Sequence, residues 1–188
     1  TKTTPFNSAH HRLNARMVDF HGWEMPLHYG SQIEEHHSVR RDCGMFDISH
    51  MCALDAIGTD AKPFMQRLLA NDVEKLRAGK ALYSCMLNED GGVIDDLIVY
   101  LREGERFRTV VNASTAEADL AWLDAVRRER GSAVTVTPRR DLAMIAIQGP
   151  NARERFWQVR PGTRAATLDL RPFFSREIGD LFIARTGY

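Results

Sequence analysis

The sequence predicts an α+β fold in which antiparallel sheets carry helices packed on one face. Between residues 51 and 137 the apolar patterns follow the order strand, helix, two or three strands, helix, strand, which is typical of a split β-α-β unit. Residues 81–87 and 93–101 are rich in β-forming residues. They flank Asn-Glu-Asp-Gly-Gly at 88–92, a strong hairpin signal. The pattern contains no internal repeat.

Four helices are predicted, over 31–41, from 60, from 114 to 130, and from 150 onwards. Capping boxes of the form Ser-x-x-Glu begin the first at Ser31 and the third at Ser114, and Gly131 follows the third. Asp60 caps the second helix, and Pro63 lies in its first turn, where proline costs no hydrogen bond. Strands are predicted where residues alternate or run apolar, at 51–57, 81–87, 93–101, 106–112, 133–137, 142–147 and 175–185.

Composition excludes several classes of protein. The chain has 188 residues, 44% of them hydrophobic, which is ordinary for a globular protein and argues against disorder or a coiled coil. Its 25 basic residues balance 25 acidic ones, so no nucleic-acid or membrane-surface binding is expected. The apolar runs are far shorter than the roughly 20 residues of a membrane-spanning helix.

No metal site or nucleotide loop is predicted. Cys43, Cys52 and Cys85 have spacings that fit neither a zinc site nor a redox pair, and they are expected to be reduced thiols. All seven histidines precede residue 51, but the adjacent His36 and His37 point about 100° apart on a helix and cannot chelate together. Glycine-rich phosphate loops and the Gly-x-Ser-x-Gly hydrolase motif are absent from the sequence.

The most informative residues are Asp95 and Asp96, which lie in the apolar run 93–101. Side chains alternate faces in a strand, so each face carries one carboxylate. Both faces are otherwise apolar, which predicts a strand covered on both sides and at least one carboxylate with a specific role. Asp95 has the alternative of bonding backbone amides at the hairpin end. Asp96 lies deeper in the run and is the better candidate for binding a ligand N–H or accepting a proton.

Several stretches resemble the T-protein of the glycine cleavage system, the tetrahydrofolate-dependent aminomethyltransferase family. The resemblance covers the chain from about residue 5 to its end. It rests on the order of the following blocks: Ala15–Trp23, Met25–Tyr29, Glu35–Arg40, Gly44–Met51, Ala70–Val73, Gly79–Ser84, Gly91–Tyr100, Val110–Asn112, Gln148–Pro150 and Thr186–Tyr188. Each block alone is moderately specific, and together they are highly specific.

The resemblance implies a transferase. Such an enzyme transfers the methylene of the aminomethyl group on the lipoyl arm of H-protein to tetrahydrofolate, the co-substrate, and releases ammonia. Lipoylated H-protein is therefore the expected protein partner, and no metal cofactor is expected. The match with the mature start of bacterial members implies the bacterial cytoplasm. The Arg-rich second half, with 15 basic and 11 acidic residues after residue 100, is a candidate for meeting an acidic partner.

The resemblance also implies the site residues. Asp96 matches the key aspartate of the family and is the expected catalytic residue. The expected folate-binding set is Met51, Tyr83, Asp96, Val111, Asn112 and Tyr188. For Met51 and Val111 an ordinary core position is equally compatible with the sequence, whereas Tyr83 and Asn112 are better explained by a ligand.

Members of the family are longer than this chain. By resemblance, residues 1–50 and 139–188 form an incomplete first domain, residues 51–138 form an inserted second domain, and the third domain of the family lies beyond this sequence. The full-length parent is therefore expected to be catalytic and these residues alone inactive. Two alternatives remain: a non-catalytic folate-binding relative, such as the iron–sulfur assembly factor of this fold, or an inactive fragment.

Overall fold

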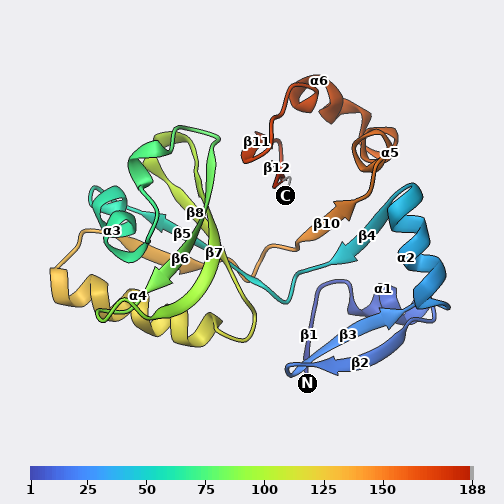
Figure 1. The fold of residues 1–188 in the computed structure, drawn as a ribbon, viewed down its shortest axis with the longest axis horizontal. Coiled ribbons are helices and arrows are strands. Elements are labelled where there is room, and N and C mark those ends of the chain that lie inside the picture. The colour runs from blue at the N-terminus through green and yellow to red at the C-terminus, as the bar shows by residue number, and fades with distance from the viewer. Residues whose placement is uncertain (187–188) are drawn as a thin grey trace. The chain divides into compact units, whose positions relative to one another are not determined.

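The computed structural model describes residues 1–186 and forms two compact units (Figure 1). The first unit contains Thr1–His50 and Asp141–Ala165, and the second contains Met51–Arg140 and the chain from Ala166. Residues 166–186 thus pack with the second unit, whereas the expected first domain included all of 139–188. The domain boundaries of the whole protein stay a prediction.

The first unit combines two small sheets with helices. Strand β3 (Trp23–His28) pairs antiparallel with β2 (Arg16–Phe20) and parallel with the two-residue β1 (Lys2–Thr3). Strand β4 (Gly44–Asp47) pairs antiparallel with β10 (Ile145–Gln148), so the two chain segments of the unit are joined by a sheet. Its helices are α1 (Asn7–Arg12), α2 (Gln32–Arg41) and α5 (Ala152–Val159).

Buried hydrogen bonds fix the first unit. The ring of His10 lies between the hydroxyl of Tyr29, at 2.7 Å, and the carboxylate of Asp47, at 3.0 Å from Nε2. His10 is buried, so this histidine is a satisfied packing residue. Arg155 of α5 donates to Asp42 beyond α2 at 2.7 Å, which connects the end of one helix to the other.

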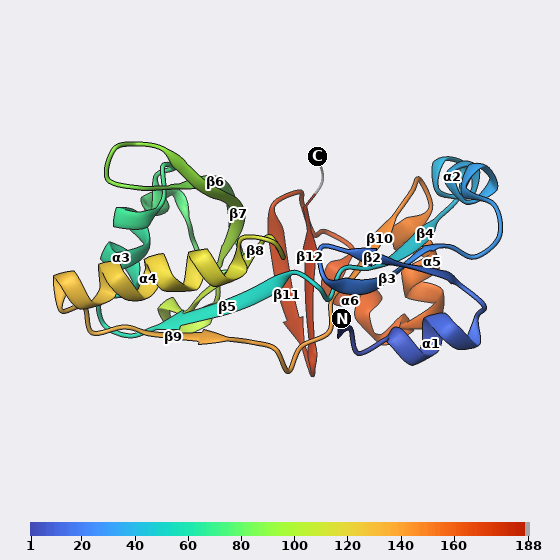
Figure 2. The same cartoon turned by 90° about the horizontal axis from the view of Figure 1, so that it is seen from below.

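The second unit is built on a five-stranded antiparallel sheet of order β6-β7-β8-β5-β9 (Figure 2). The strands are β5 (Cys52–Ile57), β6 (Ala81–Leu87), β7 (Val93–Leu101), β8 (Phe107–Val111) and β9 (Thr135–Pro138). Helices α3 (Ala61–Leu68) and α4 (Ala116–Arg130) pack on one face of this sheet. A separate hairpin, β11 (Phe174–Ile178) and β12 (Leu181–Arg185), follows later in the chain. Short helical turns lie at Val73–Lys75, Glu103–Glu105, Pro161–Thr163 and Arg164–Thr167.

The core of the second unit lies between the sheet and its two helices. Phe64 and Leu68 of α3 and Leu123 of α4 meet Val99 of β7 and Phe107 of β8, all of them buried. Burying a side chain of this size contributes about 1.5–3 kcal/mol relative to leaving it in water. The core therefore defines one covered face of the sheet, which we call the helix face. We call the opposite surface the open face.

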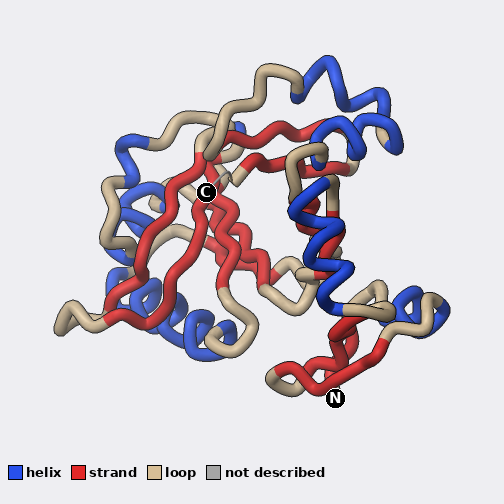
Figure 3. The backbone as a smooth tube through the Cα atoms, turned by 45° about the vertical axis from the view of Figure 1, so that its right-hand side comes forward, coloured by secondary structure: helices blue, strands red, loops and turns tan. Residues whose placement is uncertain are grey.

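The predicted α+β class is confirmed, with helices on one face of an antiparallel sheet (Figure 3). Helix α2 begins as predicted, because the Ser31 hydroxyl accepts from the Glu34 amide at 3.3 Å. The hairpin β6–β7 also forms as predicted. In its turn, Asn88 accepts from the Gly92 amide at 2.7 Å, and Gly91 adopts a φ of 81°. Gly131 ends α4 in the left-handed conformation with a φ of 60°.

Several element predictions are wrong. The expected strand over 175–185 is a hairpin that turns at Gly179, whose φ of 60° suits glycine. The expected capping box at Ser114 does not form, because α4 is capped one residue later by Thr115 without a side-chain hydrogen bond. The sequence patterns did not predict β1, α1, β2, β3, β4 or the short helical turns. The strands among them are short, and tertiary pairing rather than a local pattern defines them.

A buried ion cluster connects the open face of the sheet to the β11–β12 hairpin. Asp55 of β5 is buried and accepts two hydrogen bonds of 2.7 Å from Arg108 and one of 2.7 Å from Arg139. Arg102 donates to Asp55 at 3.3 Å and, in a forked pair at 2.7 and 2.6 Å, to Glu177 of β11. Burial alone would raise the pKa of Asp55, but the hydrogen bonds from Arg108 and Arg139 outweigh it and hold the pKa below its usual value.

Asp55→Asn is expected to destabilise the protein strongly, because it keeps the shape of the side chain but leaves buried guanidinium groups without their charge partner. Breaking one side of a buried ion pair costs about 3–5 kcal/mol. The matched control is Asp124→Asn, which removes a solvent-accessible carboxylate paired with Arg127 and Arg128 and should cost far less. Urea unfolding of both variants measures the difference, and equal losses would contradict the cluster's role.

Candidate functional site

Asp95 and Asp96 lie on opposite faces of the sheet, as alternation requires, but only one of the two is buried. Asp95 is buried at 6% exposure on the helix face, and Asp96 is exposed on the open face. The expectation that β7 is covered on both sides is therefore wrong for the described residues. Helices cover only one face, and on the open face the β11–β12 hairpin contacts the Tyr100 end of β7 through Phe182, with ring centroids 5.1 Å apart.

Asp96 forms a short hydrogen bond with Tyr83 on the open face. The Tyr83 hydroxyl donates to Asp96 Oδ2 at 2.6 Å, a short bond of the kind that a charged acceptor forms. Register explains the contact: Tyr83 lies opposite Ile98, two residues from Asp96, so their side chains share a face. Tyr83 is 46% exposed. The pair thus presents a carboxylate and an aromatic ring to whatever covers the open face.

Asn112 connects the two aspartates. Its backbone N–H donates to Asp95 Oδ2 at 3.1 Å, and its side-chain Nδ2 donates to Asp95 Oδ1 at 2.9 Å and to the Asp96 carbonyl at 3.1 Å. Asp95 does bond a backbone amide, but it is that of Asn112 after β8 and not one at the hairpin end, where the sequence had suggested it. Both Nδ2 hydrogens of Asn112 are used by the two aspartates.

A buried acid, Asp119 of α4, lies behind this site. Its side chain is 0% exposed, and its oxygens have no hydrogen-bond partner among the described residues. Burial, followed by the negative charge of Asp95, raises the pKa of Asp119 to about 7. Burial also acts on Asp95, but the hydrogen bonds from Asn112 outweigh it and lower the pKa of Asp95. Asp95 therefore stays ionised while Asp119 holds a proton near neutral pH.

Sequence reasoning missed Asp119, although a signal was present. Asp119 precedes Leu123 by four residues and Val126 by seven, which is the spacing of one helix face, and both of those residues are buried. A carboxylate on the apolar stripe of an amphipathic helix should have been flagged in the same way as the aspartates of β7. Cys85 was also treated only as a small core residue, yet it lies directly opposite Asp96 in the register.

The other residues of the predicted folate-binding set lie in different surroundings. Met51 is half-buried at the start of the second unit. Val111 is 1% exposed and belongs to the core, and its predicted role in a folate site stays a prediction. Its neighbour Val110 pairs with Ile98 and so lies on the open face with Asp96. Tyr188 lies outside the described residues, so its predicted role stays a prediction.

The described part of the chain lacks two kinds of feature. No group of three or more His, Cys, Asp or Glu side chains there could hold a metal ion. None of its helices is both long and apolar enough to cross a membrane.

The comparisons with known proteins agree with the resemblance. Residues 6–188 match the GCVT N-terminal domain. The aminomethyltransferases of Nitrosomonas europaea and Burkholderia multivorans are 58% and 56% identical to the chain, which is covered completely and spans 52% of each relative. The crystal structure of glycine cleavage system aminomethyltransferase T from Bartonella henselae superposes with a TM-score of 0.86 at 34% identity over 100% of this chain and 50% of that one.

The chain therefore belongs to the GCVT N-terminal domain family. It spans about half the length of the curated relatives it matches.

The Asp119 pKa predicts an unusual pH dependence of stability. Between about pH 4 and pH 7 the folded state keeps a proton on Asp119 that the unfolded state releases, so this carboxyl's contribution to stability falls as pH rises. In Asp119→Asn the side chain is neutral at every pH, so the variant does not lose this stability as pH rises. The variant should melt near the wild-type temperature at pH 4.5 and on the order of 10 °C above it at pH 8, since each pKa unit is worth about 1.36 kcal/mol and each kcal/mol moves the melting temperature by about 2–4 °C.

Differential scanning calorimetry across this pH range measures the effect. Asp124→Asn on the same helix serves as the control, because its carboxylate is not buried and its pKa is lowered by Arg127 rather than raised. A constant difference in melting temperature between Asp119→Asn and the wild type would show that Asp119 does not bind a proton in this range.

Proposed function

We propose that the whole protein is a tetrahydrofolate-dependent aminomethyltransferase of the glycine cleavage system. It would transfer the methylene of an aminomethyl group from the lipoyl arm of H-protein to tetrahydrofolate, with release of ammonia and of the reduced lipoyl arm. The observation that carries the proposal is the hydrogen-bonded pair of Tyr83 and Asp96 on the open face, in a chain that belongs to the GCVT N-terminal domain family.

The open face offers the groups that a reduced pterin needs. A pterin edge carries several N–H donors, and the open face presents the Asp96 carboxylate as an acceptor for them. The exposed ring of Tyr83 supplies a flat surface for a flat heterocycle, and Ile98 and Val110 supply apolar contact on the same face. The site therefore fits the folate chemically.

Asp96 would act mainly by electrostatics. A carboxylate that accepts a hydrogen bond from a folate nitrogen favours positive charge on that nitrogen as it attacks the methylene carbon. Tyr83 holds the carboxylate in place by donating to Oδ2, so Oδ1 is available to the ligand. In water such an interaction is weak, so we expect further parts of the whole protein to cover this face during the reaction.

Two finer proposals follow. Lipoylated H-protein is the macromolecular partner, because the reaction needs a carrier that delivers the aminomethyl group. The bacterial cytoplasm is the proposed location, and it is supported by the bacterial origin of the relatives.

Asp96→Asn in the whole protein should reduce kcat/KM by about 100-fold or more, because the variant loses the charge that favours the reacting nitrogen. The assay is formation of 5,10-methylene-tetrahydrofolate from tetrahydrofolate and aminomethyl-loaded H-protein. The matched control is Asp90→Asn in the exposed turn of the same hairpin, which changes the total charge equally and should leave the rate unchanged.

A second comparison separates chemistry from folding. Asp95→Asn should lower the melting temperature more than Asp96→Asn does, because only Asp95 is buried and holds the Asn112 amide. Equal rate losses in Asp96→Asn and Asp90→Asn would refute the role of Asp96. Binding of tetrahydrofolate without turnover by the wild-type protein would favour a non-catalytic folate-binding relative.

A further inference from the structure

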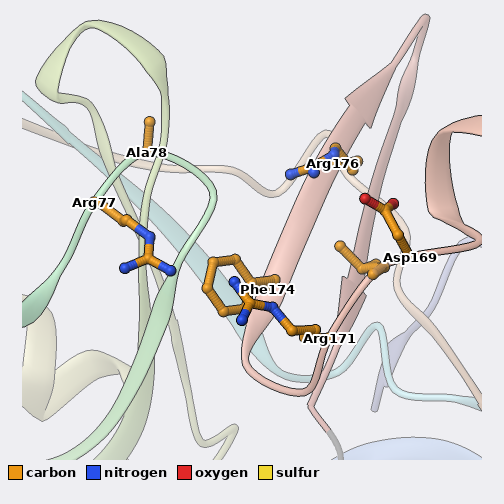
Figure 4. A pocket seen from close by; sticks show the side chains of 7 residues that line it. Arg77, Ala78, Asp169, Arg171, Phe174 and Arg176 are labelled. Atoms are coloured by element: carbon orange, nitrogen blue, oxygen red, sulfur yellow. The ribbon is translucent and has the colours of Figure 1, made fainter.

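A cavity of about 260 Å³ in the second unit is lined by three arginines, two of which lie against one aromatic ring (Figure 4). Arg77 comes from the turn before β6, and Arg171 comes from the segment before β11. Phe174 and Arg176 belong to β11 itself. Asp169 is the one carboxylate among the lining residues. Nothing in the proposed reaction uses this cavity.

The cavity is separate from the open-face site. Phe182 lies opposite Glu177 in the β11–β12 hairpin, and both point to the sheet, where they meet Tyr100 and Arg102. Phe174 and Arg176 differ from Glu177 by odd numbers of residues, so they lie on the other face of the hairpin. The arginine cavity therefore points away from the side of the hairpin that packs against Tyr100.

Backbone hydrogen bonds hold the two walls of the cavity together. The Ser175 amide donates to the Gly79 carbonyl at 2.7 Å, and the Ala81 amide donates to the Phe173 carbonyl at 2.8 Å. These bonds place the turn that carries Arg77 beside β11. The cavity is thus formed by the fold rather than by flexible side chains alone.

The guanidinium groups of Arg77 and Arg171 lie against the ring of Phe174, and no carboxylate in the described part of the chain forms an ion pair with them. The Cζ atoms of Arg77 and Arg171 lie 5.2 and 4.9 Å from the centroid of Phe174, within the range of cation–π contacts. Arg176 donates only to the Ser175 carbonyl, at 3.3 Å. In the described part of the chain none of the three has a carboxylate within 4.0 Å. With Asp169 included, the lining carries a net charge of plus two.

Such an arrangement selects for an anion. Contact with Phe174 restrains the two side chains, and the N–H groups of a guanidinium match the two oxygens of a carboxylate or phosphate. Two cations beside one ring repel each other, and an anion bound nearby reduces that repulsion. Ligand pockets usually measure about 300–1,000 Å³, so this smaller cavity suits one anionic group rather than a whole cofactor.

We propose that Arg77, Arg171 and Arg176 form an anion-binding subsite for a carboxylate or phosphate group. The group can belong to a small molecule or to an acidic side chain of a protein partner, because the chemistry of recognition is the same. This proposal does not depend on the aminomethyltransferase activity.

Titration with inorganic phosphate, followed by the Arg Nε–Hε signals in ¹H–¹⁵N NMR spectra at constant ionic strength, tests the subsite. The three lining arginines should shift together and saturate with one dissociation constant. Arg171→Gln should weaken binding about 10-fold, since a charge-assisted hydrogen bond is worth about 1.5–3 kcal/mol. Asp169→Asn should tighten binding severalfold, because it removes the one negative charge.

Arg67→Gln is the matched control, because Arg67 is an exposed arginine of α3 outside the cavity. A second titration with the dipeptide Glu-Glu distinguishes the sources: tighter binding of the dipeptide indicates a protein carboxylate, and tighter binding of phosphate indicates a small anion. Shifts that do not saturate with either probe would overturn the proposal. So would equal weakening by Arg171→Gln and Arg67→Gln.

Discussion

The two adjacent carboxylates of β7 must point to opposite sides of the sheet, because successive side chains of a strand alternate. This constraint places Asp95 among the core residues under α4 and places Asp96 on the open face. A charge on the core side is tolerable only if hydrogen bonds satisfy it. Asn112 supplies two of them, and the neighbouring Asp119 stays protonated near neutral pH. Much of the site's architecture follows from these requirements.

The hydrogen bonds around Asp95 extend to Asp96 through the Asn112 amide. The two amide hydrogens of Asn112 go to the Asp95 carboxylate and to the Asp96 carbonyl. Tyr83 donates to one oxygen of the Asp96 carboxylate. A carboxylate and an aromatic ring thus lie together on the open face. The Asp55 cluster fixes the other end of the same face by joining the sheet to the β11–β12 hairpin.

Local sequence signals were sufficient for the strongly patterned elements. The Ser31 cap, the turn at Asn88–Gly92 and the αL glycine at 131 are determined by chemistry within a few residues, and all three were predictable. Strands β2, β3 and β4 and the hairpin turn at Gly179 depend on pairing between distant segments or on a single turn, so their local patterns are weak.

The residues of the site could be predicted from the sequence, but their burial could not. Alternation correctly separated Asp95 from Asp96, and the family resemblance selected Asp96 and Tyr83, which prove to be hydrogen-bonded. Burial of Asp96 was predicted from apolar neighbours on both faces, but an apolar strand face need not be covered within the described residues. The arginine cavity was invisible in the sequence because Arg77 and Arg171 lie 94 positions apart and meet only at Phe174.

The most direct test of the account uses a natural probe on the open face. Cys85 lies opposite Asp96, whereas Cys52 is buried in the core and Cys43 belongs to the first unit. Iodoacetamide labelling of the whole protein, resolved for each cysteine by mass spectrometry, reports which face tetrahydrofolate covers. The account predicts that saturating tetrahydrofolate slows the labelling of Cys85 severalfold and leaves that of Cys43 unchanged. An unchanged rate at Cys85 under verified saturation would contradict it.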